Sequence, residues 1–205
     1  MVETVSQEPT GPESRGAVRR EQRRSLIISA AQAELAEVGL AGLTLAGVGA
    51  RVGLSKAALY YYVDSRDALL ALVLGDALDA IRLDAALLAG EGATALDRLT
   101  AFATAHVRAS VERPAGPLIA SSVYELAALD ATAELLRRHT AELVTIVDEA
   151  VEAGQLREMH AAVAAAAVFG TLNSIAGSFD PAGQLTLDEV VEQALSLLLD
   201  GWRSR

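Results

Sequence analysis

Three consecutive tyrosines, Tyr60, Tyr61 and Tyr62, closely follow Lys56, the only lysine of this 205-residue chain. The whole chain has one Trp, four Tyr and three Phe, so the cluster is its most unusual local feature. A lysine ammonium and tyrosine hydroxyls can donate hydrogen bonds to phosphate oxygens, while tyrosine edges and small alanines can contact bases. These residue types therefore indicate contact with double-stranded DNA.

The spacing around the tyrosines predicts a short helix with one buried face. Ser55 can cap its start, and Leu59 and Val63 lie four residues apart, so they share a face, with Tyr62 beside them. The outward positions are then Lys56, Ala57, Tyr60 and Tyr61. Three consecutive residues cannot all point inward on one helix, so at least one tyrosine is expected to be exposed.

Two further helices are predicted before this one. Apolar residues recur at helical spacing from about 18 to 38, and Gly39 is expected to end that helix. Thr44 can cap a second helix that runs to about residue 52 and stops at Gly53. A helix, a short helix, a glycine-containing turn and a third helix form the helix-turn-helix layout.

The rest of the chain is predicted to be helical as well. The expected helices cover roughly residues 66–89, 94–112, 117–129, 131–153, 159–177 and 186–202, and no useful strand-like alternation occurs. We therefore expect an all-α protein. Residues 1–15 are expected to be a disordered tail, residues 16–65 a three-helix DNA-binding domain, and residues 66–205 a six-helix domain for effector binding and dimerisation.

The charge is divided unevenly along the chain. The whole protein has a formal net charge of −10, which by itself disfavours binding to phosphates. Residues 15–66, however, carry a net charge of +4, whereas residues 67–205 carry −11. A mildly basic head on an acidic body is compatible with DNA contact through the head alone.

The sequence contains no motif that is typical of an enzyme active site or a metal site. The chain has no cysteine, and its three histidines do not stand in a metal-binding or zinc-protease pattern. The glycines in "GVGARVG", residues 47–53, lack the preceding strand that a nucleotide loop requires. We expect no catalytic residue, no metal and no cofactor. No long uninterrupted apolar run and no secretory signal are evident, so a cytoplasmic protein without membrane contact is expected.

The segment "TLAGVGARVGLSKAALYYYVDSRDALL", residues 44–70, resembles the DNA-binding signature of the tetracycline-repressor (TetR) family of bacterial regulators. Ala57 stands where a glycine is frequent, and Val63 where phenylalanine is usual. The resemblance implies that the third helix enters the major groove of DNA. The residues that it places near DNA are Thr44, Ser55, Lys56, Ala57, Tyr60, Tyr61, Tyr62 and Arg66. The run of Arg19, Arg20, Arg23 and Arg24, expected before or at the start of the first helix, is predicted to add phosphate or minor-groove contacts.

The last two helices, residues about 159–202, are predicted to form a homodimer interface. One carries a stripe of small residues, and the other is apolar on two sides, which requires cover from a partner as well as from its own core. The family also dimerises through its final two helices. A dimer would present two reading helices to a near-palindromic operator.

An effector pocket is expected between the acidic helices. Mostly apolar positions with a few polar groups suit a small, largely hydrophobic ligand. The candidate lining residues are Phe102, His106, Tyr124, His139, Phe169, Asn173 and Phe179. The leading hypothesis is a repressor that a ligand releases from its operator, against a ligand-independent DNA-binding regulator or activator and, more remotely, a small helical enzyme.

Overall fold

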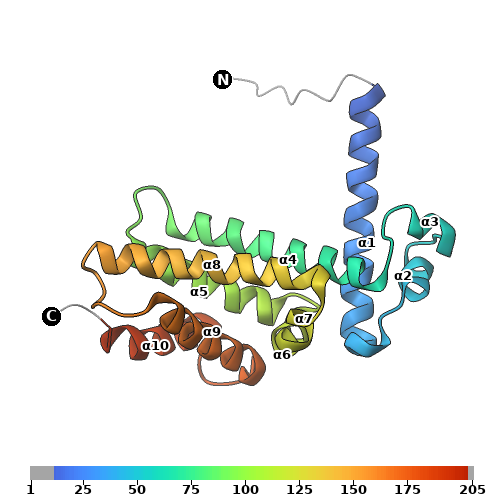
Figure 1. The fold of residues 1–205 in the computed structure, drawn as a ribbon. Coiled ribbons are helices and arrows are strands. Elements are labelled where there is room, and N and C mark those ends of the chain that lie inside the picture. The colour runs from blue at the N-terminus through green and yellow to red at the C-terminus, as the bar shows by residue number, and fades with distance from the viewer. Residues whose placement is uncertain (1–11, 203–205) are drawn as a thin grey trace, which may run out of the picture.

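The computed structural model describes residues 12–202, and within that range the chain is helical without strands (Figure 1). The first helix, α1 (Pro12–Gly42), is interrupted at Gly39, whose φ of 73° lies outside the helical region. The predicted end of the helix at Gly39 is thus a kink followed by a last short turn. The predicted tail is too long at its inner end, because residues 12–15 already belong to α1. Residues 1–11 lie outside the described part.

The next two helices are set by their capping hydroxyls, as predicted. The helix α2 (Leu45–Arg51) starts where Thr44 Oγ1 accepts a hydrogen bond from the Gly47 amide at 3.0 Å. The helix α3 (Lys56–Tyr60) starts where Ser55 Oγ accepts from the Ala58 amide at 3.2 Å. Each cap satisfies one of the free N–H groups that begin a helix.

A close backbone approach explains a glycine that helix propensity disfavours. A Cβ atom added to Gly49 in α2 would lie 2.9 Å from the carbonyl oxygen of Leu54. The amide of Leu54 also donates to the carbonyl of Gly49 at 2.9 Å, which fixes the turn between α2 and α3. Glycine at this position therefore lets the turn fold back on the helix.

The long helix α4 (Arg66–Ala89) belongs to two hydrophobic cores. Its first turns contribute Leu69, Leu70 and Val73 to a core shared with α1, α2 and α3. Farther along, Leu78 and Ile81 pack toward α5 (Ala95–Glu112), beside which α4 runs in the body. The head and the body are thus connected by one continuous helix (Figure 1).

The predicted helix 117–129 is two short helices, α6 (Gly116–Ser121) and α7 (Val123–Ala127). Ser122 interrupts them because its backbone, with φ −104° and ψ 16°, leaves the helical region. The body accordingly has seven helices within the described residues instead of six. α8 (Asp130–Glu152) follows and packs against α4, α5 and α9.

The last two helices, α9 (Ala161–Ser178) and α10 (Leu187–Asp200), cover one side of the body, the lower side in Figure 1. By length and composition alone α9 could cross a membrane, but one of its faces packs against α5, α6, α8 and α10. Its small-residue stripe, Ala162, Ala166, Gly170, Ser174 and Gly177, is exposed in the single chain. On α10, Val191, Leu195 and Leu199 are buried, whereas Leu197 is 83% exposed.

Candidate DNA interface and ligand cavity

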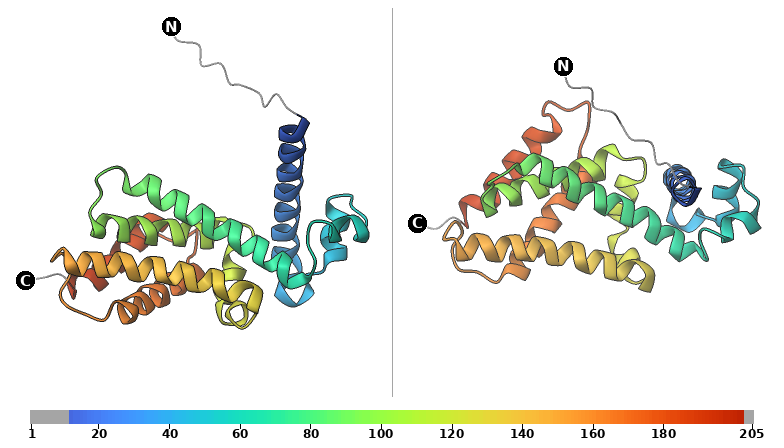
Figure 2. Two further views of the ribbon diagram at one scale, coloured as in Figure 1. Left: turned by 45° about the horizontal axis from the view of Figure 1, so that its top comes forward. Right: turned by 90° about the horizontal axis from the view of Figure 1, so that it is seen from above.

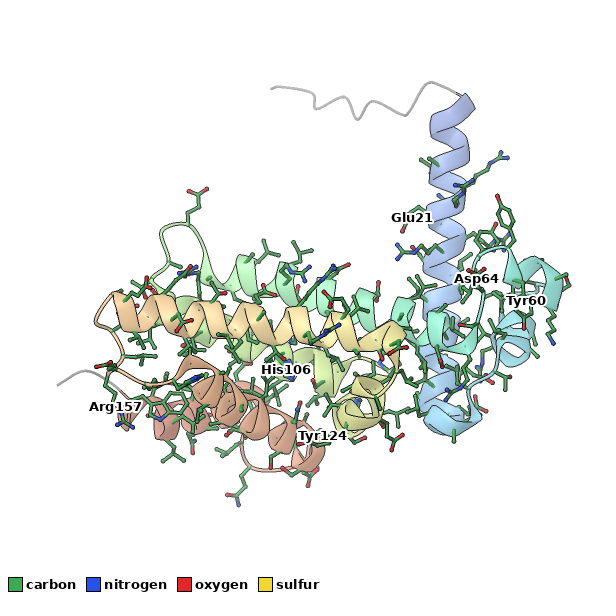
Figure 3. All side chains as sticks on the ribbon, viewed as in Figure 1. Glu21, Tyr60, Asp64, His106, Tyr124 and Arg157 are labelled. Atoms are coloured by element: carbon green, nitrogen blue, oxygen red, sulfur yellow. The ribbon has the colours of Figure 1, made fainter. Side chains whose placement is uncertain are left out.

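The outward face of α3 matches the prediction for most of its residues. Lys56, Ala57, Tyr60 and Tyr61 are exposed, Tyr61 to 72%, while Leu59 and Val63 are buried in the core of the head. The ammonium of Lys56 lies 5.7 Å from the centre of the Tyr60 ring, within cation–π range. Figure 3 places Tyr60 on the side of the head away from the body. This face therefore offers one cation, two phenols and one small side chain to a partner.

Tyr61 and Tyr62 depart from the simple helical reading. The helix α3 ends at Tyr60, and Tyr61 occupies its C-cap position. Tyr62 is half-buried against the head core and meets Tyr61 edge to face, with ring centroids 5.2 Å apart. Tyr62 therefore supports the position of Tyr61 and exposes less of its own ring than the other two tyrosines.

The two capping hydroxyls remain able to act as donors. Thr44 and Ser55 are exposed, and in both caps the hydroxyl oxygen acts as the acceptor. A hydroxyl group also carries one donor hydrogen, which capping leaves available for an oxygen of a partner. Their place at the exposed starts of α2 and α3 is compatible with the predicted phosphate contacts.

Arg66 has internal partners that sequence reasoning missed. Its guanidinium donates to the carbonyl oxygen of Leu40 in the last turn of α1 and, at 3.3 Å, to that of Leu43 just after the helix. These carbonyls are among the groups that a helix end leaves free. Arg66 is thus half-buried and joins the start of α4 to the end of α1, while its contact with the DNA backbone stays a prediction.

The arginine run lies inside α1 instead of before it or at its start. Arg19, Arg20 and Arg24 are exposed and Arg23 is half-buried, and Arg24 forms a surface ion pair with Glu21 at 3.5 Å. Figure 1 and the left view of Figure 2 show this N-terminal half of α1 standing clear of the body. A basic helix in this position is available to a polyanion without displacing any packed element.

A cavity of about 1050 Å³ opens in the body between α4 and the helices α5 to α9. Leu74, Leu78 and Ile81 of α4 form one wall, and Ala166 and Gly170 of the exposed α9 stripe lie along another. The lining is mainly apolar, with polar groups at a few positions, which is the usual composition of a small-molecule site.

Five of the seven predicted ligand residues line this cavity, namely His106, Tyr124, His139, Phe169 and Asn173. Tyr124 is 88% exposed, whereas His106 lies deep between the body helices (Figure 3). Phe102 does not line the cavity: it is 1% exposed and stacks against His139, with ring centroids 4.9 Å apart. Phe179 is also absent from the lining, because it occupies the C-cap of α9 after the helix has left the cavity.

Two buried histidines and an asparagine form a hydrogen-bonded chain in the cavity wall. His106 Nδ1 lies 3.2 Å from His139 Nε2, and His106 Nε2 lies 3.2 Å from Asn173 Oδ1. Burial lowers the pKa of both histidines, for His139 to about 3, since an imidazolium would be poorly solvated there. Both side chains are therefore neutral at pH 7.

Polar groups at the head-facing end of the cavity connect the body with α1. Asp76 of α4 accepts a hydrogen bond from Gln32 of α1 at 3.1 Å and one from Arg113, just after α5, at 3.2 Å. Gln32 and Arg113 both line the cavity. Sequence reasoning missed this cluster, because nothing in the local pattern around Gln32 or Asp76 distinguishes them from solvated helix residues.

Comparisons with known proteins agree with this architecture. Residues 27–73 match the family of bacterial regulatory proteins, tetR family, and residues 92–202 match the tetracyclin repressor-like C-terminal domain. The chain therefore belongs to the TetR family of DNA-binding transcriptional regulators. Among curated protein sequences, none matches this chain.

Solved structures share the fold over nearly the whole chain. KstR2, a ketosteroid transcriptional regulator of Mycobacterium tuberculosis, is 20% identical, with 89% of this chain and 96% of that chain covered and a TM-score of 0.67. AibR, solved with isovaleryl coenzyme A and operator DNA, is 19% identical, with coverage of 86% and 98% and a TM-score of 0.71. A TetR/AcrR-family regulator from Thermobifida fusca YX-ER1 is 28% identical, with coverage of 89% and 99% and a TM-score of 0.61.

Proposed function

We propose that this protein is a repressor that binds a near-palindromic operator as a homodimer and is released by a small, largely hydrophobic ligand. The observation that carries the DNA part is the exposed face of Lys56, Ala57, Tyr60 and Tyr61 on α3, in a chain of this family. The ligand part is supported by the mainly apolar cavity against α4. The known complex of AibR with a coenzyme A thioester and DNA is a precedent for both partners in one fold.

Dimerisation is part of the proposal. One α3 per chain contacts one half-site, so a palindrome needs two chains about one helical turn of DNA apart, roughly 34–36 Å. The exposed small residues of α9 permit close approach of another helix, and the exposed Val163 and Leu197 would be covered there. We place the interface on α9 and α10.

Ligand release would act through α4. A ligand in the cavity contacts Leu74, Leu78 and Ile81, and the same helix begins at Arg66, which holds the end of α1. A shift of α4 therefore moves α1 and the reading helix with it. A coupling free energy of about 1–3 kcal/mol changes operator occupancy roughly 5- to 150-fold, so a small shift is sufficient.

A gel-shift titration with the DNA that flanks the protein's own gene tests this function. We expect salt-dependent binding to a palindromic segment, and release when hydrophobic compounds are added. Binding that no compound affects would favour a ligand-independent regulator, and failure to bind any palindrome would reject the regulatory proposal. We propose no catalytic activity, because the buried histidines are neutral and bonded to each other and to Asn173.

A further inference from the structure

The inner wall of the cavity contains more polar groups than an apolar ligand alone requires. Ser110, His106 and His139 all line it, and they are 8%, 8% and 4% exposed. Ser110 lies four residues after His106 on α5, so the two side chains are on the same face, about one helical turn or 5.4 Å apart. Asn173 of α9 joins them through His106. Buried polar groups are costly unless they are paired, so an unpaired one in a cavity wall indicates a partner.

The hydrogen bonds of the histidine chain determine where its protons lie. Asn173 Oδ1 can only accept, so His106 Nε2 carries a proton and donates to it. His106 Nδ1 is then bare and accepts from the Nε2–H group of His139. The remaining nitrogen, His139 Nδ1, is buried without a partner in the described chain. Three of the four imidazole nitrogens are therefore hydrogen-bonded within the chain of side chains, and the fourth, His139 Nδ1, is buried. Neither histidine can donate a hydrogen bond to a ligand in the cavity.

Two donors remain in the same wall. Within residues 12–202, neither the hydroxyl of Ser110 nor the amide nitrogen of Asn173 makes a hydrogen bond, and both residues line the cavity. Both groups are neutral. The two arginines of the lining have acidic partners, since Arg113 pairs with Asp76 and Arg137 with Glu134. Asp130 adds a negative charge to the lining.

We propose that the ligand is an uncharged, mainly apolar compound with a carbonyl oxygen that accepts hydrogen bonds from Ser110 and Asn173. This inference rests on the proposed function and identifies the chemical class of its effector. A carbonyl oxygen satisfies both donors at small desolvation cost. A carboxylate would lose its hydration without gaining an unpaired cation, and it would be repelled by Asp130. The site therefore selects ketones, esters or thioesters against free carboxylic acids of equal length.

Displacement of the neutral fluorescent probe N-phenyl-1-naphthylamine from the purified protein at pH 8 tests the inference without DNA. The competitors are 2-undecanone and undecanoate, which have the same number of carbon atoms and differ in charge. We expect the ketone to displace the probe at a concentration about tenfold lower than the carboxylate. Ser110→Ala and Asn173→Ala should each weaken ketone binding by roughly 5- to 10-fold and leave the carboxylate unchanged, as expected for loss of one hydrogen bond.

Ser121→Ala is the matched control, because Ser121 is exposed on α6, bonds to its own helix at Leu118 O and does not line the cavity. Circular dichroism and the gel shift identify any variant that has lost its fold. Three outcomes would overturn the inference. Undecanoate could bind as tightly as the ketone or more tightly, ketone binding could be unchanged by both substitutions, or neither compound could displace the probe. These outcomes are separate from the proposed function, whose failure is a wild-type protein that binds no operator.

Discussion

At the scale of single residues, the proposed DNA-contacting face of α3 consists of its exposed residues, Lys56, Ala57, Tyr60 and Tyr61. Lys56 and Tyr60 stand side by side on that face, in cation–π contact, and both side chains can reach a neighbouring molecule. A lysine on phosphate contributes affinity regardless of sequence, whereas a tyrosine edge can also discriminate between bases. Replacement of the two residues is therefore expected to change operator binding in different ways.

Lys56→Ala and Tyr60→Ala should each weaken operator binding by about 1–3 kcal/mol per half-site, which abolishes the shift at moderate protein concentration. Lys56→Ala should also reduce the salt dependence by about one charge per half-site, which Tyr60→Ala should not do. Gel shifts at several salt concentrations measure both effects. Leu87→Ala, at an exposed leucine of α4 that does not line the cavity, is the control, and unchanged affinity in the α3 variants would remove these residues from the interface.

The buried histidines predict a pH dependence of stability. Their pKa values are lowered in the folded state, so the unfolded chain binds more protons between its ordinary histidine pKa of about 6.5 and the folded value. Stability is therefore complete above about pH 6.5 and falls as the pH decreases toward the folded pKa, which is about 3 for His139. At pH 5.5 the loss for His139, whose folded pKa is about 3, is about 1.4 kcal/mol.

Urea unfolding at pH 7.5 and pH 5.5, at one fixed protein concentration, checks this dependence. The wild type should have a lower midpoint at pH 5.5, and His139→Leu should reduce the difference between the two midpoints. The difference is the relevant readout, because the substitution also changes packing against Phe102. A pH difference equal to that of the wild type would show that His139 is not the group responsible.

At the scale of elements, the close contact between α2 and the turn before α3 determines how the protein responds to a substitution at Gly49, and the expected effect is opposite to helix propensity. Gly49→Ala should destabilise the protein by about 1–3 kcal/mol, although alanine is the better helix former, because its Cβ would overlap the Leu54 carbonyl. Gly75→Ala in α4 is the matched case, since its Cβ would be 3.9 Å from the Leu135 side chain. It should stabilise by roughly 0.5–1 kcal/mol. Thermal unfolding separates the two, and equal shifts would contradict the argument.

The link between α4 and α1 predicts a second effect at this scale. Asp76→Ala removes the acceptor shared by Gln32 and Arg113, so α1 should be held less firmly against the body. We expect faster amide hydrogen exchange in α1 around Gln32 and an operator affinity lower by about 5- to 10-fold. Asp79→Ala, on the same helix but paired with Arg82, should leave both unchanged. If Asp76→Ala behaves like Asp79→Ala, the hydrogen bonds of Asp76 do not hold α1 in the position that operator binding needs.

At the scale of the whole molecule, the exposed faces of α9 and α10 carry the homodimer interface that we propose. An arginine at Ala162 of the α9 stripe would introduce charge and bulk where close helix contact is proposed. Ala162→Arg should therefore convert a dimer to a monomer and reduce operator affinity by at least about tenfold, since one half-site alone is bound weakly. Light scattering coupled to gel filtration measures the mass. Ala86→Arg, at an exposed alanine of α4, should remain dimeric, and a dimeric Ala162→Arg would move the interface elsewhere.

The sequence alone determined the features that arise within one or two helical turns. Thr44 and Ser55 could be identified as caps because a cap bonds to an amide three residues ahead. The buried positions of Leu59 and Val63 followed from the period of one helix. The all-α fold and the helix-turn-helix were predictable for the same reason, and the family match is consistent with them.

Only the tertiary structure determined which helix faces pack against each other. His106 bonds to residues 33 and 67 positions away, and no local pattern specifies which helix lies opposite another. The packing of helices that are distant in sequence also explains three further findings. Phe102 and Phe179 do not line the cavity. Arg66 bonds to the end of α1, and Gln32 bonds to Asp76. A helical period states that a residue faces inward, but only the packing of the neighbouring helices determines whether it meets a core, a cavity or a polar partner.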